Sequence, residues 1–551
     1  MRVPLSWLRD FAPFPAAAGD RSSVVDLGRV MDELGLVVEG VEWVGEGLSD
    51  VVVSRVLEIT AIPGADRIRR VVVDAGAPAG VSGGASAGPV EVVCGAWNFS
   101  VGDLVPLAPV GAVLPGGFAI GRRKMRGVTS NGMLCSAKEL GLGGDAAGIL
   151  VLGRSADAAG GSGAASGAGG SGTAGGAGAA GGSGAVGGGG PEPGTPLAQA
   201  LGISVDAVYD LAIETNRPDA LCVAGVARDV AARLGLPFAV PGLGPAEVTW
   251  ADLPDPGAPG GEGIVVGTGR EELAELASVS IEAPELCPRF LARALVDVTV
   301  GSSPPWLAGR LTLAGMRPIN SIVDASNYVM LELGQPTHPY DLDRLAGHGL
   351  TVRQAGAGEQ LVTLDGVERV LGRDPRSGRP VDDCLICDAE GGPVGIAGIM
   401  GGSSSEISEG TTRVLLEAAY FDPMAVARTS RRLGLRTEAS MRFERGCDPE
   451  GIDWAVERFC RLVSGGGAGG GGAGGAGAGG PAPSGGCPRP AAGSARVVPG
   501  TIEVRDQVPA LAVVKVRTAR VNAVLGTELS DDQIAGYLGP IGFMVTPAGP
   551  G

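Results

Sequence analysis

The sequence predicts an α+β multidomain fold, and three observations lead to it. The chain has 551 residues, enough for about three or four domains. Short β-branched runs fill residues 40–153, whereas apolar residues recur at helical spacing in residues 22–34 and again after residue 215. Two stretches made almost wholly of Gly, Ala and Ser, residues 158–191 and 464–487, divide the chain.

The charge and the cysteines narrow the class of protein. A net charge of -17 argues against a general nucleic-acid coat, so an RNA partner would have to meet a local basic patch or another subunit. The nine cysteines show no framework spacing, and residues 1–7 carry no signal-peptide hydrophobic run. Both features predict a cytoplasmic location.

The glycine-rich stretches are not membrane spans, because they lack the large apolar side chains that drive insertion. They cannot bury enough surface to offset the entropy of ordering. We therefore expect disordered insertions at residues 154–195 and 464–496.

The first segment, residues 1–39, predicts an N-terminal helical unit. Ser22 and Ser23 are candidate N-caps, and Leu27, Met31 and Leu34 recur at helical spacing. We expect a structural role for this helix.

Residues 40–153 predict a small β-barrel of the OB type. The β-branched runs 51–57, 70–74 and 90–94 are separated by Gly and Pro, and such barrels bind nucleic acid on one exposed face. The densest positive run of the chain, residues 122–126, lies in this segment. A solvated charged turn would explain that run equally well.

Three strings in this segment, residues 65–68, 94–98 and 124–136, resemble the tRNA-binding OB domain of several aminoacyl-tRNA synthetases. The sequence departs from that family at residues 62–64 and at Trp97. The resemblance implies that tRNA contacts come from the basic run, namely Arg122, Arg123, Lys124 and Arg126. This domain alone would also fit a free-standing tRNA-binding protein.

Residues 196–463 resemble the central editing domain of bacterial phenylalanyl-tRNA synthetase beta subunits. Five strings carry the resemblance in order: residues 215–221, 286–290, 317–342, 395–402 and 438–446. The resemblance implies a mixed α/β editing domain that hydrolyses tyrosine wrongly attached to the phenylalanine tRNA. A second site is needed because a hydrophobic pocket cannot strongly reject an analogue that adds only a hydroxyl.

Without the family, few residues in this segment suggest chemistry. Of the two histidines, His338 lies in a rigid turn between Pro336 and Pro339, whereas His348 lies in a loop. Glu368 follows an Asp-Gly turn that predicts a hairpin, where an exposed position is the ordinary expectation.

The resemblance favours a functional role for both His338 and Glu368, and it implies an editing pocket. His338 matches the family's pocket histidine, which positions the ester or the attacking water. Glu368 matches the glutamate that bonds the tyrosine hydroxyl, since phenylalanine would leave that carboxylate unpaired. Other matching positions are Asn327 among the catalytic set, and Pro336, Gly395 and Ala397 in the substrate-binding wall.

Two motifs are rejected as sites. Cys384 and Cys387 form a lone close pair with no second pair and no nearby His, so no metal site is expected. Arg442 and Glu444 imitate the Arg-x-Glu spacing that grips ATP in class II synthetases, but their flanks match the end of the editing domain. The sequence contains no P-loop.

The last segment, residues 497–551, predicts a strand at 514–517 and two short helices at 520–526 and 530–538, the second capped by Ser530. It resembles the start of a winged-helix-like domain, so we expect the chain to be cut short relative to the family. The family's magnesium-binding stretch and later domains would then be absent.

The resemblance implies a phenylalanine-tRNA ligase beta subunit that binds tRNA(Phe) and proofreads. In that family the alpha subunit carries aminoacylation with ATP and Mg²⁺, in an assembly of two alpha and two beta chains. Two alternatives stay open from the sequence: a free-standing tRNA-binding or deacylase module, and a scaffold with an inactive editing pocket.

Overall fold

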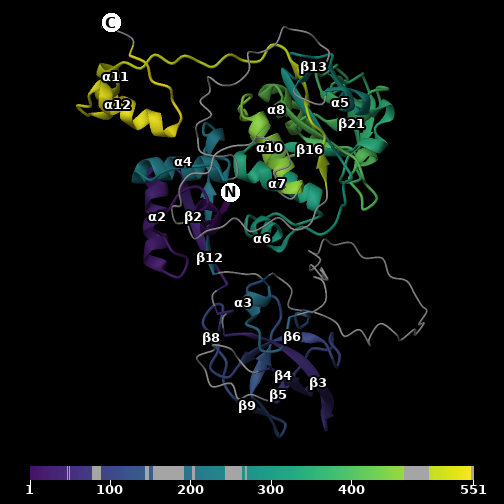
Figure 1. Ribbon diagram of the computed structural model, residues 1–551. Coiled ribbons are helices and arrows are strands. Elements are labelled where there is room, and N and C mark those ends of the chain that lie inside the picture. The colour runs from purple at the N-terminus through teal and green to yellow at the C-terminus, as the bar shows by residue number, and fades with distance from the viewer. Residues whose placement is uncertain are drawn as a thin grey trace, which may run out of the picture. The chain divides into compact units, whose positions relative to one another are not determined.

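The structure is a computed structural model, and it describes residues 1–547 apart from residues 46, 49, 77–88, 143–147, 153–190, 202–204, 242–263, 267–269 and 465–494. Most of the expected insertions, 154–195 and 464–496, therefore lies outside the described residues. The chain divides into two compact units (Figure 1): residues 42–207, the barrel unit, and residues 1–41 with 208–551, the two-sheet unit. Within the described ranges, no helix is long and apolar enough to cross a membrane.

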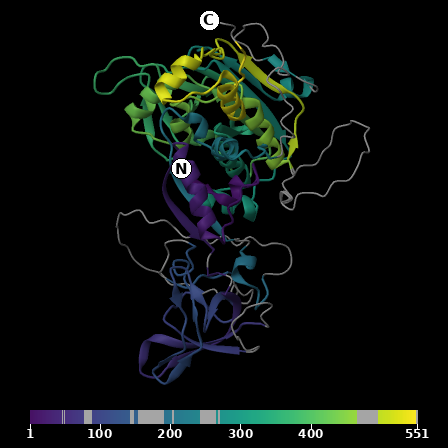
Figure 2. The same ribbon diagram turned by 90° about the vertical axis from the view of Figure 1, so that its left-hand side faces the viewer.

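The barrel unit is built on one antiparallel sheet of five strands in the order β11–β6–β3–β4–β5. The strands are β3 (Val52–Ile62), β4 (Ala65–Asp74), β5 (Pro89–Cys94), β6 (Leu104–Pro109) and β11 (Gly132–Leu134). The backbone N–H of Asn131, directly before β11, donates a 2.9 Å hydrogen bond to Glu91 on β5, so the two ends of the sheet meet. The result is a small, partly open barrel, purple and blue in Figure 2. The strands expected at 51–57, 70–74 and 90–94 are confirmed.

Valines explain why this sheet curls around its own core. Val56, Val71, Val73 and Val92 are all buried in one cluster with Phe99. β-branched side chains fit a pleated, half-buried surface, and alternation places every second one inside.

Two small hairpins and a short helix complete the barrel unit: β7 (Val113–Leu114) with β8 (Phe118–Ala119), β9 (Arg123–Met125) with β10 (Val128–Ser130), and α3 (Leu197–Ala200). In the second hairpin Met125 pairs with Val128, which leaves Arg126 and Gly127 as a two-residue loop. Their φ angles of 49° and 87° are both left-handed, as a type I′ turn requires. The basic run is thus held on a tight hairpin.

The N-terminal part of the two-sheet unit contains a three-stranded sheet in the order β1–β12–β2. Its elements are β1 (Arg2–Pro4), β2 (Val37–Val44), β12 (Asp206–Ala212), α1 (Leu5–Leu8), α2 (Arg21–Glu33), the 3-10 turn η2 (Pro218–Ala220) and α4 (Val223–Leu234). The helix predicted at 22–34 is confirmed, but its N-cap is Asp20. The Asp20 carboxylate accepts the Ser22 backbone N–H, which places both candidate serines in the first turn.

The first large sheet holds β13 (Ile264–Val266), β25 (Thr501–Arg505), β15 (Arg289–Val296), β23 (Val414–Tyr420) and β16 (Thr337–Asp341) in that order, and β24 (Arg496–Val497) also pairs with β15. Helices α7 (Ser321–Leu333) and α10 (Ile452–Val463) cover one face, as Figure 1 shows. Asn320 caps the start of α7, and Gly334 ends it with a φ of 83°. The helices cover that face, so the opposite face packs against the second large sheet.

The second large sheet has the order β14–β17–β20–β21–β22. Its strands are β14 (Ser278–Ile281), β17 (Gly349–Gln354), β20 (Cys384–Asp388), β21 (Pro393–Ile396) and β22 (Met400–Gly401); β18 (Glu359–Val362) and β19 (Glu368–Leu371) form the predicted hairpin beside it. The remaining helices here are α5 (Arg270–Leu276), α6 (Pro305–Leu313), α8 (Pro423–Leu433) and α9 (Glu438–Phe443). One continuous core joins the two large sheets through residues such as Phe290, Leu415, Ile386 and Ile396.

The C-terminal segment differs from its prediction in two ways. Helices α11 (Thr518–Leu525) and α12 (Asp531–Leu538) confirm the expected pair, and Ser530 caps α12 in a capping box with Gln533. The strand expected at 514–517 is wrong: these residues form neither helix nor strand, and Val514 is 69% exposed. A strand needs a neighbouring strand to accept its hydrogen bonds. In the first large sheet, β15 pairs with Thr501–Arg505 and not with residues 514–517. The segment expected as a separate unit from residue 497 therefore begins inside that sheet.

Candidate functional site

The candidate site lies where two neighbouring strands bring a histidine and a glutamate together. β16 runs antiparallel to β23, and His338 is directly opposite Glu417 in the register. Side chains in such a pair have Cβ atoms roughly 5 Å apart on one face of the sheet. Tyr340 is two residues beyond His338, so it points to the same face. That face looks toward the second large sheet, since Tyr340 and Leu415 belong to the core between the sheets.

Direct contacts link these three side chains. The Tyr340 hydroxyl donates a 2.6 Å hydrogen bond to Oε2 of Glu417. The His338 ring meets the Tyr340 ring edge to face, with centroids 4.5 Å apart and an interplanar angle of 71°. In the described part of the chain, neither ring nitrogen of His338 has a hydrogen-bond partner, and the Glu417 carboxyl has no donor other than Tyr340. Imidazole and carboxyl can both still bind a ligand.

Two glycines of the second sheet make room beside this group. A Cβ built on Gly401 would lie 2.4 Å from Cε1 and 2.6 Å from Nε2 of His338. A Cβ on Gly395 would lie 3.5 Å from the Tyr340 hydroxyl oxygen. The two residues pair with each other across β21 and β22. The backbone of the second sheet thus approaches the imidazole more closely than a side chain at residue 401 would allow.

Burial sets the protonation of the site. Desolvation lowers the pKa of His338 to about 4, so the imidazole is neutral at physiological pH. Burial raises the pKa of Glu417 to about 7, although the hydrogen bond from Tyr340 opposes that change. Burial also raises the pKa values of the nearby Cys287 and Cys384 thiols, which stay protonated. The site therefore pairs a neutral base with a carboxyl group that titrates near neutral pH.

The predicted site residues differ in their position and burial. Pro336 is buried directly before β16, Gly395 lies on β21 beside Tyr340, and Ala397 is buried just after β21. Asn327 is half-buried on α7, and its side chain has no hydrogen-bond partner among the described residues. Glu368 is exposed on β19, opposite Val362. No contact among the described residues joins the Glu368 and His338 side chains, but the hairpin that carries Glu368 adjoins the site: the Leu364 backbone N–H donates a 3.0 Å hydrogen bond to the carbonyl of Gly401, which lies against the His338 ring.

Glu417 is a candidate site residue that the sequence analysis did not single out. It is 7% exposed and is the single acidic residue in the otherwise apolar strand Val414–Tyr420. A carboxylate in a buried strand must be paired or protonated, so this pattern was a usable signal. The Asp-Gly turn before Glu368 drew attention to an exposed hairpin instead.

The structure also places the other residues of this segment that the sequence singled out. His348 lies in a turn with a φ of 50°, and its Nδ1 lies 3.2 Å from the Leu342 carbonyl. Arg442 is buried on α9 and donates to the carbonyl and carboxylate of Glu438. Cys384 and Cys387 are both buried, free thiols within β20. Among the described residues, no group of three or more His, Cys, Asp or Glu residues could hold a metal ion.

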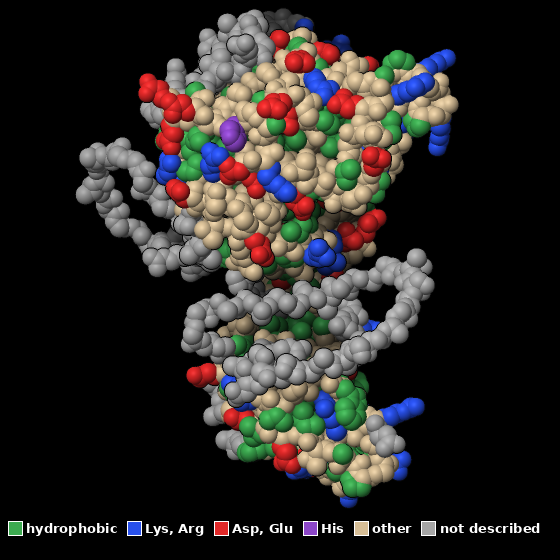
Figure 3. Space-filling model, turned by 90° about the vertical axis from the view of Figure 1, so that its right-hand side faces the viewer, with side chains coloured by type: hydrophobic (Ala, Val, Ile, Leu, Met, Phe, Trp, Pro, Cys, Tyr) green, Lys and Arg blue, Asp and Glu red, His purple; other side chains and the backbone are tan. Residues whose placement is uncertain are grey.

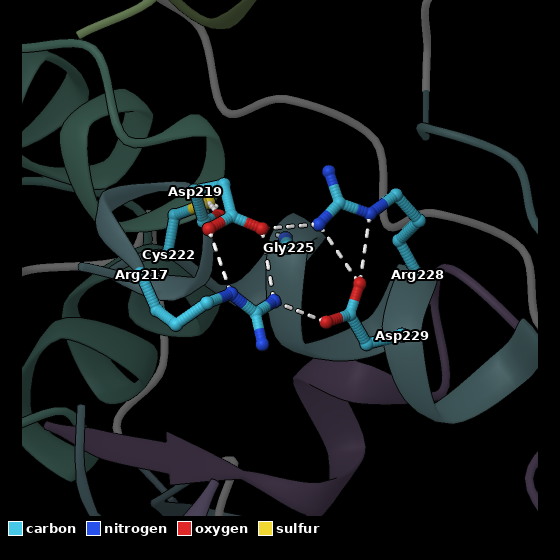
Figure 4. A network of polar contacts seen from close by, with 6 residues as sticks. All are labelled: Arg217, Asp219, Cys222, Gly225, Arg228 and Asp229. Atoms are coloured by element: carbon cyan, nitrogen blue, oxygen red, sulfur yellow. Dashed lines mark hydrogen bonds and ion pairs between the residues drawn. The ribbon is translucent and has the colours of Figure 1, made fainter. Parts of the chain in front are cut away.

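The string at 215–221 forms a charge network at the start of α4 (Figure 4). Arg217 and Arg228 alternate with Asp219 and Asp229, and Arg217 holds Asp219 with contacts of 3.0 and 2.9 Å. A Cβ on Gly225 would lie 1.8 Å from the Asp219 carbonyl oxygen, so only glycine allows the turn to close. Positive and negative charges cancel here, and this fits a structural role.

The barrel unit offers a separate candidate nucleic-acid interface. Arg122, Arg123, Lys124 and Arg126 are all exposed, and basic side chains project from this unit in Figure 3. A pocket of about 570 Å³ lies beside them, lined by Arg123, Lys138 and the exposed Phe118 among others. Trp97 is 63% exposed, and the Arg69 guanidinium lies 4.8 Å from the centre of its ring. Proteins that bind single-stranded nucleic acid use exposed aromatic rings, on which bases stack, together with cationic side chains that contact the backbone.

Models of known protein families match residues in both units. Residues 51–160 match the family described as "Putative tRNA binding domain", and residues 286–465 match the family described as "B3/4 domain". The fold and these matches define a multidomain protein that joins a putative tRNA-binding domain to a B3/4 domain.

Similarity over most or all of this chain gives the family. The phenylalanine–tRNA ligase beta subunit of Anaeromyxobacter dehalogenans is 42% identical over 84% of this chain and 48% of its own length. Those of Geobacter metallireducens and Moorella thermoacetica are 36% and 37% identical over 100% of this chain and 55% and 56% of theirs. The chain belongs to the family of bacterial phenylalanine–tRNA ligase beta subunits, and it spans about half the length of the curated relatives it matches.

A solved N-terminal fragment of the phenylalanyl-tRNA synthetase beta-subunit from Pyrococcus horikoshii is also similar. It is 13% identical, covering 61% of this chain and 77% of that chain with a TM-score of 0.26. That likeness is too low to add to the argument.

Proposed function

We propose that this chain binds tRNA(Phe) and removes tyrosine wrongly attached to it, as the beta subunit of phenylalanine–tRNA ligase. The observation that carries the proposal is the His338–Glu417 pair: a neutral, unpartnered imidazole opposite a buried carboxyl group. The tRNA-binding and B3/4 matches support the same reading.

In the proposed reaction, Glu417 recognises the substrate. The phenol of a bound tyrosyl group donates a hydrogen bond to its carboxylate, whereas a phenylalanyl group would leave the buried carboxylate without that donor. Leaving a buried polar group unsatisfied costs about 1–3 kcal/mol, which corresponds to a preference of roughly 5- to 150-fold. We place Glu417 ahead of Glu368 in this role, because a solvated carboxylate gains little from one more hydrogen bond. Glu368, which matches the family's recognition glutamate, stays proposed as the alternative.

His338 then acts on the ester. With its pKa lowered to about 4, the imidazole can accept a proton from water at neutral pH without first having to lose one. Water attacks the ester carbonyl and gives a proton to His338, the bond to the tRNA ribose oxygen breaks, and His338 returns that proton to the leaving oxygen. Free tyrosine and tRNA are the products. Asn327, Pro336, Gly395 and Ala397 remain proposed as members of the pocket.

The whole enzyme's other properties are part of the proposal. Aminoacylation with ATP and Mg²⁺ would belong to the assembly with the alpha subunit, two alpha with two beta chains, in the cytoplasm. The described residues offer no donor set for a metal ion, so no step of the editing reaction is assigned to one. The domain limits set out from the sequence, including a winged-helix-like start within residues 497–551, also stay proposals.

Hydrolysis of tyrosyl-tRNA(Phe) and phenylalanyl-tRNA(Phe) by the full chain tests the proposal. We expect His338→Ala to reduce hydrolysis of the tyrosyl ester at least tenfold, and Glu417→Gln to reduce the preference for tyrosyl over phenylalanyl esters. Glu368→Gln is the matched control and should leave both rates unchanged. If the Glu368 variant loses discrimination and the Glu417 variant does not, our assignment is wrong. If neither His338→Ala nor Glu417→Gln changes hydrolysis, the reaction does not use this site.

A further inference from the structure

The pocket of the barrel unit has a lining that suits a nucleotide. Its volume is about 570 Å³, within the roughly 300–1,000 Å³ typical of sites for small ligands. Its wall includes the ring of Phe118, which is 50% exposed, and the exposed cations Arg123 and Lys138. Neither cation forms an ion pair or a side-chain hydrogen bond with another described residue. A base can pack on such a ring, and a phosphate can meet the two cations.

One carboxylate also lines the pocket, but its hydrogen bonds are made within the protein. Oε2 of Glu139 accepts the Ser136 backbone N–H at 2.7 Å and the Ser136 hydroxyl at 2.8 Å. The lining therefore sets two unpaired cations against one carboxylate that already has donors, in a chain whose net charge is -17. This local excess of positive charge favours an anionic ligand such as the phosphate of a nucleotide.

Asn98 fixes the rim of the pocket. Its side-chain amide donates to the Ile149 carbonyl at 2.8 Å, and its amide oxygen accepts the Ile149 backbone N–H at 3.0 Å. Gly95, Ala96 and Ile149 line the pocket, so Asn98 joins the two segments that border it. A Cβ on Gly148 would lie 2.5 Å from Cγ of Asn98, so glycine lets the segments approach. A wall fixed in this way needs little ordering when a ligand binds.

Trp97 offers a second aromatic surface beside this rim. It directly follows Ala96 and is 63% exposed. The Arg69 guanidinium is buried and lies 4.8 Å from the centre of the Trp97 ring and 4.5 Å from that of Phe99. Arg69 donates to the Phe99 carbonyl at 3.2 Å, and no carboxylate among the described residues pairs with it. A buried cation thus holds the Trp97 ring from within and leaves the rest of the ring open to solvent.

We propose that this pocket holds one unpaired nucleotide of an RNA strand, with its base on Phe118 and its phosphate on Arg123 and Lys138. Trp97 then stacks the adjoining base. Bases in a duplex are already paired and stacked, so only an unpaired strand can use both rings. The inference rests on the proposed RNA binding by the barrel unit and deepens it, because it names the kind of RNA structure that is bound. It does not depend on the editing reaction.

The test measures the affinity of the full chain for a short single-stranded RNA, and for the same RNA in a duplex, by fluorescence anisotropy. The parent chain should bind the single strand more tightly. Phe118→Ala and Trp97→Ala should each weaken binding of the single strand roughly 5- to 150-fold without changing its salt dependence. Lys138→Gln should instead lower the salt dependence of log K by about 0.7. Tyr537→Ala on α12, which also removes an exposed ring, is the matched control.

Trp97→Phe separates stacking from folding, because it keeps an aromatic ring and should retain most of the affinity. A free nucleoside monophosphate should displace the labelled strand only at much higher concentration than unlabelled RNA does; equal displacement would overturn the inference, as would tighter binding of the duplex. Unchanged affinity in Phe118→Ala and Trp97→Ala would overturn it and leave the proposed RNA binding standing. If the parent chain binds neither the short RNA nor tRNA(Phe), both the inference and the proposed RNA binding are wrong.

Discussion

Gly401 lies against the imidazole of His338 so closely that a methyl group at this position would stand 2.4 Å from Cε1. The φ of Gly401 is not left-handed, so alanine is acceptable to the backbone and only the contact with the ring is at stake.

We therefore expect Gly401→Ala to displace the His338 ring and to reduce tyrosyl-tRNA(Phe) hydrolysis at least tenfold. Single-turnover deacylation with the full chain measures it. Gly309→Ala on α6 is the matched control, because a Cβ there meets nothing within 4 Å. Normal hydrolysis by the Gly401 variant would show that the ring position does not matter.

Glu417 should make stability depend on pH. Its folded-state pKa of about 7 lies above the ordinary 4.5, so its stabilising contribution is complete below pH 4.5 and is lost as the pH rises to about 7. Relative to the parent chain, Glu417→Gln should therefore become more stable by up to about 3 kcal/mol between pH 4.5 and 7.5.

The measurement is urea denaturation followed by hydrogen exchange of peptides from β16 and β23. His338 titrates in both proteins, and its pKa depends on burial, so its effect cancels. A stability difference that does not change with pH would contradict the raised pKa of Glu417.

A buried ion pair joins the two helices on the first large sheet. Arg458 of α10 donates to both oxygens of Glu332 on α7 at 2.6 and 2.9 Å, and both residues are buried. Glu332→Gln should destabilise the two-sheet unit by about 3–5 kcal/mol, because it leaves a buried guanidinium without its anion. The double change Glu332→Leu with Arg458→Met should recover most of that loss in urea denaturation. Additive losses would mean that the two charges are not coupled.

The basic hairpin should contribute to tRNA affinity through phosphate contacts. Changing Arg122, Arg123 and Lys124 to Gln and Arg126 to Asn should weaken binding and lower the salt dependence of log K by roughly 3, since each phosphate contact releases about one counterion. Asn suits residue 126 because it tolerates the left-handed backbone there. Arg376→Gln with Arg379→Gln, two exposed arginines of the two-sheet unit, is the control. An unchanged salt dependence would place the tRNA contacts elsewhere.

Local patterns predicted much of the fold. The valine runs gave the barrel strands, the Asp365-Gly366 turn marked the β18–β19 hairpin, and Ser530 marked the start of α12. Each depends on residues close together in the chain. The cap of α2 shows the limit even there, because Asp20 accepts the Ser22 N–H more directly than either serine could.

The site was harder to predict because it depends on pairing between distant strands. His338 could be singled out in its own turn, but the identity of its neighbour depends on β16 pairing with β23 in a register that places Glu417 opposite it. A slip of one residue would have turned Glu417 to the helix-covered face. Sequence spacing contains no such register, so the sequence pointed to Glu368, through its match to the family's glutamate, and not to Glu417.

The position of β25 has a consequence for how this chain folds during synthesis. β25 lies between β13 and β15, yet it is the last strand of that sheet to leave the ribosome. Until residue 505 has emerged, β13 has no neighbour in the sheet, and one edge of β15 is not fully paired. Open strand edges recruit other chains, so nascent forms that end before this point should be the ones most prone to aggregate.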